Sequence, residues 1–206
     1  DGGMGSDTIT GGDGANTVYG GEGDDEIFTG KDADLIDGGM GHDDIVSGSG
    51  DDSIYGGMCN DDIVAGSGDD SIYGGDGFDE IIAGSVDDVV EGGMGDDTIT
   101  GGEGSDTVVF AGNKGDFTFE VAADGTLTVT DLNTMTALGV DTITGVETLS
   151  FDDGDLTVTT AEDGYVTLTG TDADDDVTVV GATAVTLQGV MGSDTLTGGD
   201  GADTIV

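Results

Sequence analysis

Apolar residues recur with a period of nine over the first half of the chain. From Gly2 to Val109 the sequence divides without a gap into twelve nonapeptides, and position eight of each is Ile or Val. Positions seven to nine read outside, inside, outside, as a short β-strand with one buried side chain does. β-Branched residues also favour strands. The pattern predicts one short strand in every nonapeptide.

The residues between these strands keep the same period. Glycine dominates positions one, two and four, where it permits backbone conformations that a residue with a Cβ avoids. Position six is Asp in eleven of the twelve nonapeptides, and the exception is Asn16. Carboxylates are hard oxygen ligands of the kind that Ca²⁺ prefers. A glycine-rich turn with one aspartate therefore follows each strand, and two nonapeptides make one coil.

The charge of the chain points to cations as partners. It has 46 acidic residues and only two basic ones, Lys31 and Lys114, for a formal net charge of −44. Such a chain repels itself, and it lacks the basic surface that nucleic acid or an anionic membrane would need. Cys59 stands alone, which excludes an intrachain disulfide, and no apolar run approaches the roughly 20 residues of a membrane span.

The repeat resembles the G-G-x-G-x-D-x-U-x pattern of the RTX (repeats-in-toxin) family. The resemblance implies an all-β fold, a right-handed parallel β-roll in which Ca²⁺ lies between turns stacked on the same side. Aspartates and backbone carbonyls from repeats 18 residues apart would hold each ion. One implied column of ligands is Asp7, Asp25, Asp43, Asp61, Asp79 and Asp97, and the other is Asp34, Asp52, Asp70, Asp88 and Asp106.

Four residues depart from this pattern at positions four and six. Asn16 lacks the charge of the usual aspartate, while Asp32, Cys59 and Val86 replace the glycine of position four. We expect the calcium sites around Asn16 and Val86 to be the weakest or empty.

The period breaks after Val109 and resumes near Thr169. The sequence predicts three segments: a calcium-binding roll over 1–109, a β-rich cap or spacer over 110–169, and the start of a second roll over 170–206. The last segment adds Asp194 and Asp203 as ligand candidates. The cap is expected to begin with a hairpin that turns at Asp124 and Gly125.

The cap is expected to close the last coil of the roll. Its apolar residues Phe117, Phe119, Leu149 and Phe151 would be buried there. A separate ligand-binding role for this segment is the alternative.

Position nine places apolar side chains on the outside of the roll. Phe28, Val46, Val64 and Ile82 should form an apolar strip along one sheet, flanked by the acidic residues of position seven. Such strips can mark partner surfaces, here for self-assembly or a neighbouring domain. Strand propensity alone explains them as well.

No catalytic constellation is visible. His42 is the only histidine, in a variable turn position, and the HExxH pattern of zinc peptidases is absent. Cys59 is interpreted as a small residue tolerated in place of glycine. An ice-binding roll would need regular threonine ladders, and only scattered pairs such as Thr8 and Thr10 occur.

The sequence therefore predicts a non-enzymatic module that folds when it binds several Ca²⁺ ions. Its inward core is thin, so binding energy should become folding energy. Extracellular calcium modules have dissociation constants of about 10⁻⁴–10⁻³ M, which predicts folding outside the cell. The RTX resemblance implies export from a bacterium by type I secretion. The chain begins inside a repeat, which suggests a longer protein: a structural or surface protein such as an adhesin, surface layer or filament. The alternative is the C-terminal folding and export module of a secreted hydrolase or toxin.

Overall fold

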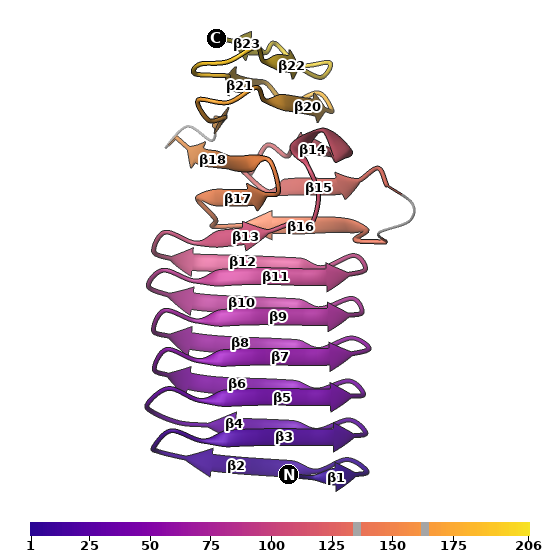
Figure 1. Cartoon of the computed structure of the whole chain (residues 1–206), viewed down its shortest axis with the longest axis vertical. Coiled ribbons are helices and arrows are strands. Elements are labelled where there is room, and N and C mark those ends of the chain that lie inside the picture. The colour runs from indigo at the N-terminus through magenta and orange to yellow at the C-terminus, as the bar shows by residue number, and fades with distance from the viewer. Residues whose placement is uncertain (134–136, 162–164) are drawn as a thin grey trace.

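Two long β-sheets, stacked face to face, make up an elongated solenoid in the computed structural model (Figure 1). The structure describes residues 1–133, 137–161 and 165–206. Within them, the only helix is the short 3₁₀ helix η1 (Lys114–Asp116). Successive strands of the repeat region alternate between the sheets, as the predicted parallel β-roll requires.

Sheet A contains the odd-numbered strands of the repeat region and one side of the cap. In spatial order it consists of β1 (Gly3–Met4), β3 (Thr17–Glu22), β5 (Leu35–Met40), β7 (Ser53–Met58), β9 (Ser71–Asp76), β11 (Val89–Met94), β13 (Thr107–Val109), β17 (Thr148–Phe151), β18 (Gly154–Thr160), β19 (Val166–Thr169), β21 (Val185–Gln188) and β23 (Thr204–Ile205).

Sheet B contains the even-numbered strands and the other side of the cap. In spatial order it consists of β2 (Thr8–Gly12), β4 (Glu26–Thr29), β6 (Asp44–Ser49), β8 (Asp62–Ser67), β10 (Glu80–Ser85), β12 (Thr98–Glu103), β16 (Val140–Thr144), β15 (Leu127–Asp131), β14 (Phe117–Val121), β20 (Asp176–Val180) and β22 (Thr195–Thr197).

Equivalent residues of neighbouring coils lie directly beside each other. Ile54 pairs with Ile72 in sheet A, and Ile63 pairs with Ile81 in sheet B, both in parallel register with an offset of 18 residues. The offset equals two nonapeptides, so every position of the repeat forms a column along the solenoid. A side chain at one position therefore meets the same kind of side chain above and below it.

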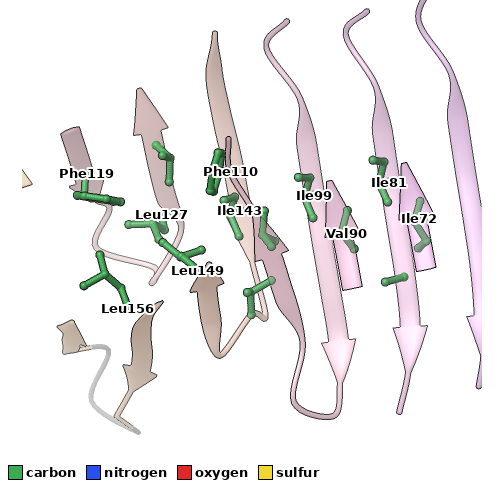
Figure 2. Packing of buried hydrophobic residues seen from close by; sticks show 14 of the residues in the cluster. Ile72, Ile81, Val90, Ile99, Phe110, Phe119, Leu127, Ile143, Leu149 and Leu156 are labelled. Atoms are coloured by element: carbon green, nitrogen blue, oxygen red, sulfur yellow. The ribbon is translucent and has the colours of Figure 1, made fainter. Parts of the chain in front are cut away.

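The position-eight residues form the core, as predicted. Ile27, Ile45, Ile54 and Ile81 have no exposed side-chain surface, and Figure 2 shows how Ile72, Ile81, Val90 and Ile99 lie between the two sheets. Burying these branched side chains removes apolar surface from water, which favours folding.

The strands are longer than the sequence pattern predicted. They continue from positions seven to nine into positions one to three of the next repeat, so β7 runs from Ser53 to Met58. Gly56 is buried on the inside, and Gly57 has φ 121°, a conformation that residues with a Cβ avoid. A Cβ on Gly57 would also collide with the carbonyl group of Gly39 in the neighbouring strand. Glycine thus lets the chain pair closely with its neighbour while it enters the turn.

The predicted hairpin of the cap is confirmed. Strands β14 and β15 pair antiparallel, with Phe119 opposite Val129, and Asp124 and Gly125 lie in the turn that joins them. Phe117, Phe119, Leu149 and Phe151 are buried, as expected. The ring of Phe151 lies 5.2 Å from that of Phe117 and 5.9 Å from that of Phe119, centroid to centroid. Figure 2 shows this wider apolar core where the regular coils end.

Both sheets continue through the cap. β12 pairs in parallel with β16, and β13 pairs in parallel with β17, although 44 and 41 residues separate the paired positions. Beyond the hairpin, β14 pairs in parallel with β20, and β19 with β21. The cap strands therefore join the two repeat segments within the same pair of sheets.

The outward residues of position nine lie where the pattern placed them. Phe28, Val46, Val64 and Ile82 are each 37–40% exposed and stack in register along sheet B. Glu26, Asp44, Asp62 and Glu80 run beside them in the same register.

Within the part of the chain that the structure describes, no helix is long and apolar enough to cross a membrane.

The residues that replace glycine at position four keep its left-handed backbone. Asp32, Cys59 and Val86 have φ values of 73°, 78° and 86°. Valine is the least suited of the three, because its branched Cβ clashes with the backbone in this region. The side chain of Val86 is also half exposed, so little packing offsets the strain.

We predict that Val86→Gly stabilises the folded protein. Glycine relieves the backbone strain of the folded state, and its greater entropy in the unfolded chain offsets part of this gain. The net effect should raise the free energy of unfolding by about 1 kcal/mol. Thermal unfolding in saturating Ca²⁺ measures the change. Val86→Ala keeps the Cβ and should recover only a small part of the gain, and equal effects of the two substitutions would contradict the strain argument.

Candidate calcium sites in the stacked turns

The predicted aspartates line two columns, one at each edge of the roll. Those of the odd repeats directly precede strands of sheet B, and those of the even repeats precede strands of sheet A. Asp7 is half-buried at the start of its column. The others are buried, with exposed fractions of 4% or less: Asp25, Asp34, Asp43, Asp52, Asp61, Asp70, Asp79, Asp88, Asp97 and Asp106.

One oxygen of each buried carboxylate is held by the neighbouring coil. The backbone N–H of Asp43 donates to Oδ1 of Asp61 over 2.8 Å, and the N–H of Asp61 donates to Oδ1 of Asp79 over 2.9 Å. The other column repeats the arrangement, with Asp52 N–H donating to Asp70 Oδ1 over 2.9 Å. Stacking at the 18-residue period therefore fixes the orientation of every carboxylate.

The second oxygen has no partner. Within residues 1–133, the buried side-chain oxygens that lack any hydrogen bond are the Oδ2 atoms of Asp7, Asp25, Asp34, Asp43, Asp52, Asp61, Asp70, Asp79, Asp88, Asp97 and Asp106. A buried oxygen without a donor costs free energy, more so when it carries charge. Eleven such atoms recur at one repeat position, and they belong to the eleven predicted ligands of this part of the chain.

Backbone carbonyls lie close to these oxygens. A Cβ built on Gly56 would lie 2.6 Å from Oδ2 of Asp61 and 2.6 Å from the carbonyl oxygen of Gly74. The carboxylate and a carbonyl of the next coil thus converge on the first glycine of the repeat. These are hard oxygen donors, the kind that Ca²⁺ takes in groups of six to eight.

Asn16 shows that a donor group fits among the oxygens of a turn. Its Nδ2 donates to the carbonyl oxygens of Gly12, over 2.9 Å, and of Gly14. It also donates to Oδ1 of Asp34 over 3.0 Å. The amide group thus places N–H donors among the oxygens of this turn, while Oδ2 of Asp34 stays without a partner. This contact gives a physical reason for the expected weakness of the site at Asn16, which stays a prediction.

Burial raises the pKa of the column carboxylates from Asp43 to Asp106. Loss of water contact is the main cause, and it raises the pKa of Asp61 to about 8, that of Asp70 to about 7 and those of Asp79 and Asp88 to about 6. Hydrogen bonds from the backbone oppose the shift, and neighbouring aspartates add to it. Each column thus disfavours its own negative charge until a cation binds.

The sequence prediction missed two members of the columns. Asp97 N–H donates to Oδ1 of Asp141 and Asp106 N–H donates to Oε2 of Glu147, each over 2.9 Å. Burial raises the pKa of Asp141 to about 8. The stretches 139–144 and 145–150 each keep the spacing of glycine, acid and apolar residue that positions four, six and eight have in the repeat. That spacing could have identified both residues.

A second ladder at position five was also missed. Oδ1 of Asp51 accepts the N–H of Asp69 over 3.1 Å, and Oδ1 of Asp87 accepts the N–H of Ser105 over 2.8 Å. These exposed side chains accept from the following coil, whereas position six accepts from the preceding one. A turn with paired aspartates, such as Asp51 and Asp52, is therefore tied to both of its neighbours.

The ligand candidates of the last segment are less buried than those of the first array from Asp25 to Asp106. Asp194 and Asp203 are half-buried. Oδ1 of Asp194 accepts the N–H of Asp175, and Oδ1 of Asp203 accepts that of Val185, both over 3.1 Å. They take part in stacking of the same kind as the first array.

The remaining sequence candidates lie on the surface. His42 is exposed in its turn, with Nδ1 2.8 Å from the carbonyl oxygen of Asn60. Cys59 is an exposed thiol. In the cap, a cavity of about 290 Å³ is lined by Asp124, Glu147 and apolar residues of β15, β16 and β18, and a ligand for it stays a hypothesis.

Side-chain clusters alone do not define the sites. Among the described residues, no three His, Cys, Asp or Glu side chains are grouped so as to hold a metal ion. An ion in these turns would combine carboxylate oxygens with backbone carbonyls, as the geometry at Gly56 and Asn16 allows.

The fold and the repeated turns define a calcium-binding β-roll. The model of the RTX calcium-binding nonapeptide repeat matches the chain over residues 1–36, 37–72, 73–108 and 186–206, which together exceed half of its length. The chain therefore belongs to this family. No curated protein matches the sequence.

We predict opposite effects of Asn16→Asp with and without calcium. In EGTA the substitution removes the N–H donors of Asn16 and adds a charge, which should lower the free energy of unfolding by about 1–3 kcal/mol. In saturating Ca²⁺ it should complete a site and raise the thermal midpoint. Asn60→Asp makes the same change at exposed position five and serves as the control. Stabilisation of the Asn16→Asp variant in EGTA would contradict the interpretation.

We predict that acid partly replaces calcium. The folded-state pKa values of Asp61 and Asp70 exceed the ordinary value of about 3.9, so the folded chain binds more protons than the unfolded chain between about pH 4 and 8. Stability of the calcium-free roll should therefore rise as the pH falls through this range. Far-UV circular dichroism in EGTA should show more β-structure at pH 5.5 than at pH 8. Equal spectra would contradict the shifts.

Proposed function

We propose that the predicted aspartates are calcium ligands and that calcium binding to them folds the chain. They are Asp7, Asp25, Asp34, Asp43, Asp52, Asp61, Asp70, Asp79, Asp88, Asp97 and Asp106, with Asp194 and Asp203 in the last segment. The observation that carries the proposal is the row of buried Oδ2 atoms without partners. Calcium bonds would satisfy these atoms and neutralise charge that otherwise opposes folding.

The setting follows from the weak affinity expected of such sites. Extracellular calcium modules bind with dissociation constants of about 10⁻⁴–10⁻³ M. A roll of this affinity stays unfolded in a calcium-poor cytosol and folds outside the cell. Export of the unfolded chain by type I secretion fits this order of events.

The role that the shape supports best is that of a structural segment in a larger secreted or surface protein. Sheets A and B run from the first repeat through the cap into the last repeats. We propose that roll (1–109), cap (110–169) and second roll (170–206) form one calcium-stiffened rod, as an adhesin stalk, surface layer or filament needs. The apolar strip Phe28, Val46, Val64 and Ile82 is the proposed lateral contact surface.

We predict that Asp61→Asn weakens calcium-dependent folding. Asp61 lies in the middle of its column with one unpartnered oxygen, so loss of its charge should raise the calcium midpoint of folding about tenfold. A calcium titration followed by circular dichroism measures this midpoint.

The neighbouring Asp62 provides the matched control. It lies on the exposed face of β8, and Asp62→Asn removes the same charge from the chain. Its calcium midpoint should stay close to that of the unmodified protein. If the two variants shift the midpoint equally, net charge and not ligation would control folding.

A further inference from the structure

A fully buried lysine lies in the cap. Lys114, in η1, has no exposed surface, whereas Lys31, the only other basic residue of the chain, pairs with Asp13 at the surface of the roll. A buried ammonium is costly unless oxygens surround it. The contacts of Lys114 therefore show what the cap offers to a cation.

Four oxygen atoms surround the ammonium group. Nζ of Lys114 lies 3.2 Å from Oδ1 of Asp153 and 3.1 Å from Oδ1 of Asp175. It donates to the carbonyl oxygens of Asp153 and Gly154 over 2.9 and 3.0 Å. Two carboxylates and two carbonyls are the donor types that Ca²⁺ takes in proteins.

Asp175 belongs to the same repeat position as the proposed calcium ligands. Residues 170–178 form a degenerate nonapeptide in which Asp175 has position six and the buried Val177 has position eight. The backbone of Asp175 continues the ladder, since its N–H donates to Oδ1 of Asp194. This turn therefore belongs to the repeat array, and the cap strands place it against η1.

The carboxylate of Asp175 differs from the eleven upstream ones in one respect. Its Oδ2 accepts the N–H of Thr171 over 2.8 Å, and its Oδ1 contacts Lys114. It is buried to the same degree, with an exposed fraction of 1%, yet both oxygens have partners. In this turn a backbone N–H satisfies the oxygen that is unpartnered upstream, and the lysine ammonium neutralises the carboxylate through its other oxygen.

We infer that the ammonium of Lys114 is a resident cation that occupies the place of a calcium ion at the Asp175 turn. This turn takes no calcium in the native chain, and the cap keeps its structure at calcium concentrations where the roll does not. The comparison with Ca²⁺ rests on the proposed function of the position-six aspartates. Without the lysine, the same oxygens form a divalent-cation site that selects Ca²⁺ over Mg²⁺, because the cage is built for a larger ion than the strict octahedron of Mg²⁺.

Hydrogen exchange of the full chain, read by mass spectrometry, tests this inference. In EGTA, peptides from 110–133 and 137–161 of the unmodified protein should stay protected while those of 20–100 exchange rapidly. Lys114→Met should speed exchange of the cap peptides in EGTA about 100-fold, because two buried carboxylates lose their counter-charge. Millimolar Ca²⁺ should restore the protection, and Mg²⁺ should not.

Two further variants control the result. Lys31→Met removes the same charge from the surface and should leave the cap unchanged. Lys114→Met combined with Asp175→Asn should not be rescued by Ca²⁺. Native mass spectrometry should count one more bound Ca²⁺ in Lys114→Met than in the unmodified chain.

Three outcomes would overturn the inference. They are a native cap that exchanges as fast as the roll in EGTA, a Lys114→Met cap that stays protected in EGTA, and a Lys114→Met cap that Ca²⁺ fails to restore. Failure of the proposed function gives a different result, because roll peptides of the unmodified chain would then gain no protection from Ca²⁺, whatever the cap does.

Discussion

Ten stacked turns present a buried aspartate whose two oxygens have unequal partners. The neighbouring coil holds Oδ1 through a backbone N–H, as Asp43 does for Asp61, while Oδ2 is buried without a donor. The parallel 18-residue register forces this arrangement, because it places the same residue above and below every turn. Burial then raises the pKa of carboxylates such as those of Asp61 and Asp70. The roll is a structure whose own stacking creates the need for a cation.

Two side chains with N–H donors, those of Asn16 and Lys114, support this view. Asn16 directs its amide N–H groups at turn carbonyls and at Asp34, and Lys114 places an ammonium between Asp153 and Asp175. Neither turn has an unpartnered position-six oxygen among those of the described residues. In both turns the chain itself supplies N–H donors to oxygens that would otherwise be available to an ion from the medium. Their distribution would set which parts of the solenoid depend on calcium.

The strict nine-residue period made the roll predictable, whereas the inserted cap residues lie outside this period and could not be placed from it. Because position eight is always Ile or Val, residues such as Ile54 and Ile81 could be placed in the core, and the aspartate columns followed from the same count. Asp141 and Glu147 were missed because they rejoin the columns 44 and 41 residues after Asp97 and Asp106, outside the nine-residue period. The role of Lys114 depends on contacts with residues 39 to 61 positions away, which no local pattern encodes. The strands were predicted too short because the pairing of glycines with neighbouring carbonyls is invisible in a hydrophobic pattern.

The most direct test of the central claim is far-UV circular dichroism during a Ca²⁺ titration of EGTA-treated protein, with Mg²⁺ as the control. If unpartnered carboxylates hold the roll open until calcium binds, β-structure should appear cooperatively between about 10⁻⁴ and 10⁻³ M Ca²⁺, and Mg²⁺ should not reproduce it. A chain whose repeats already show their full β-signal in EGTA at neutral pH, unchanged by calcium, would contradict the account.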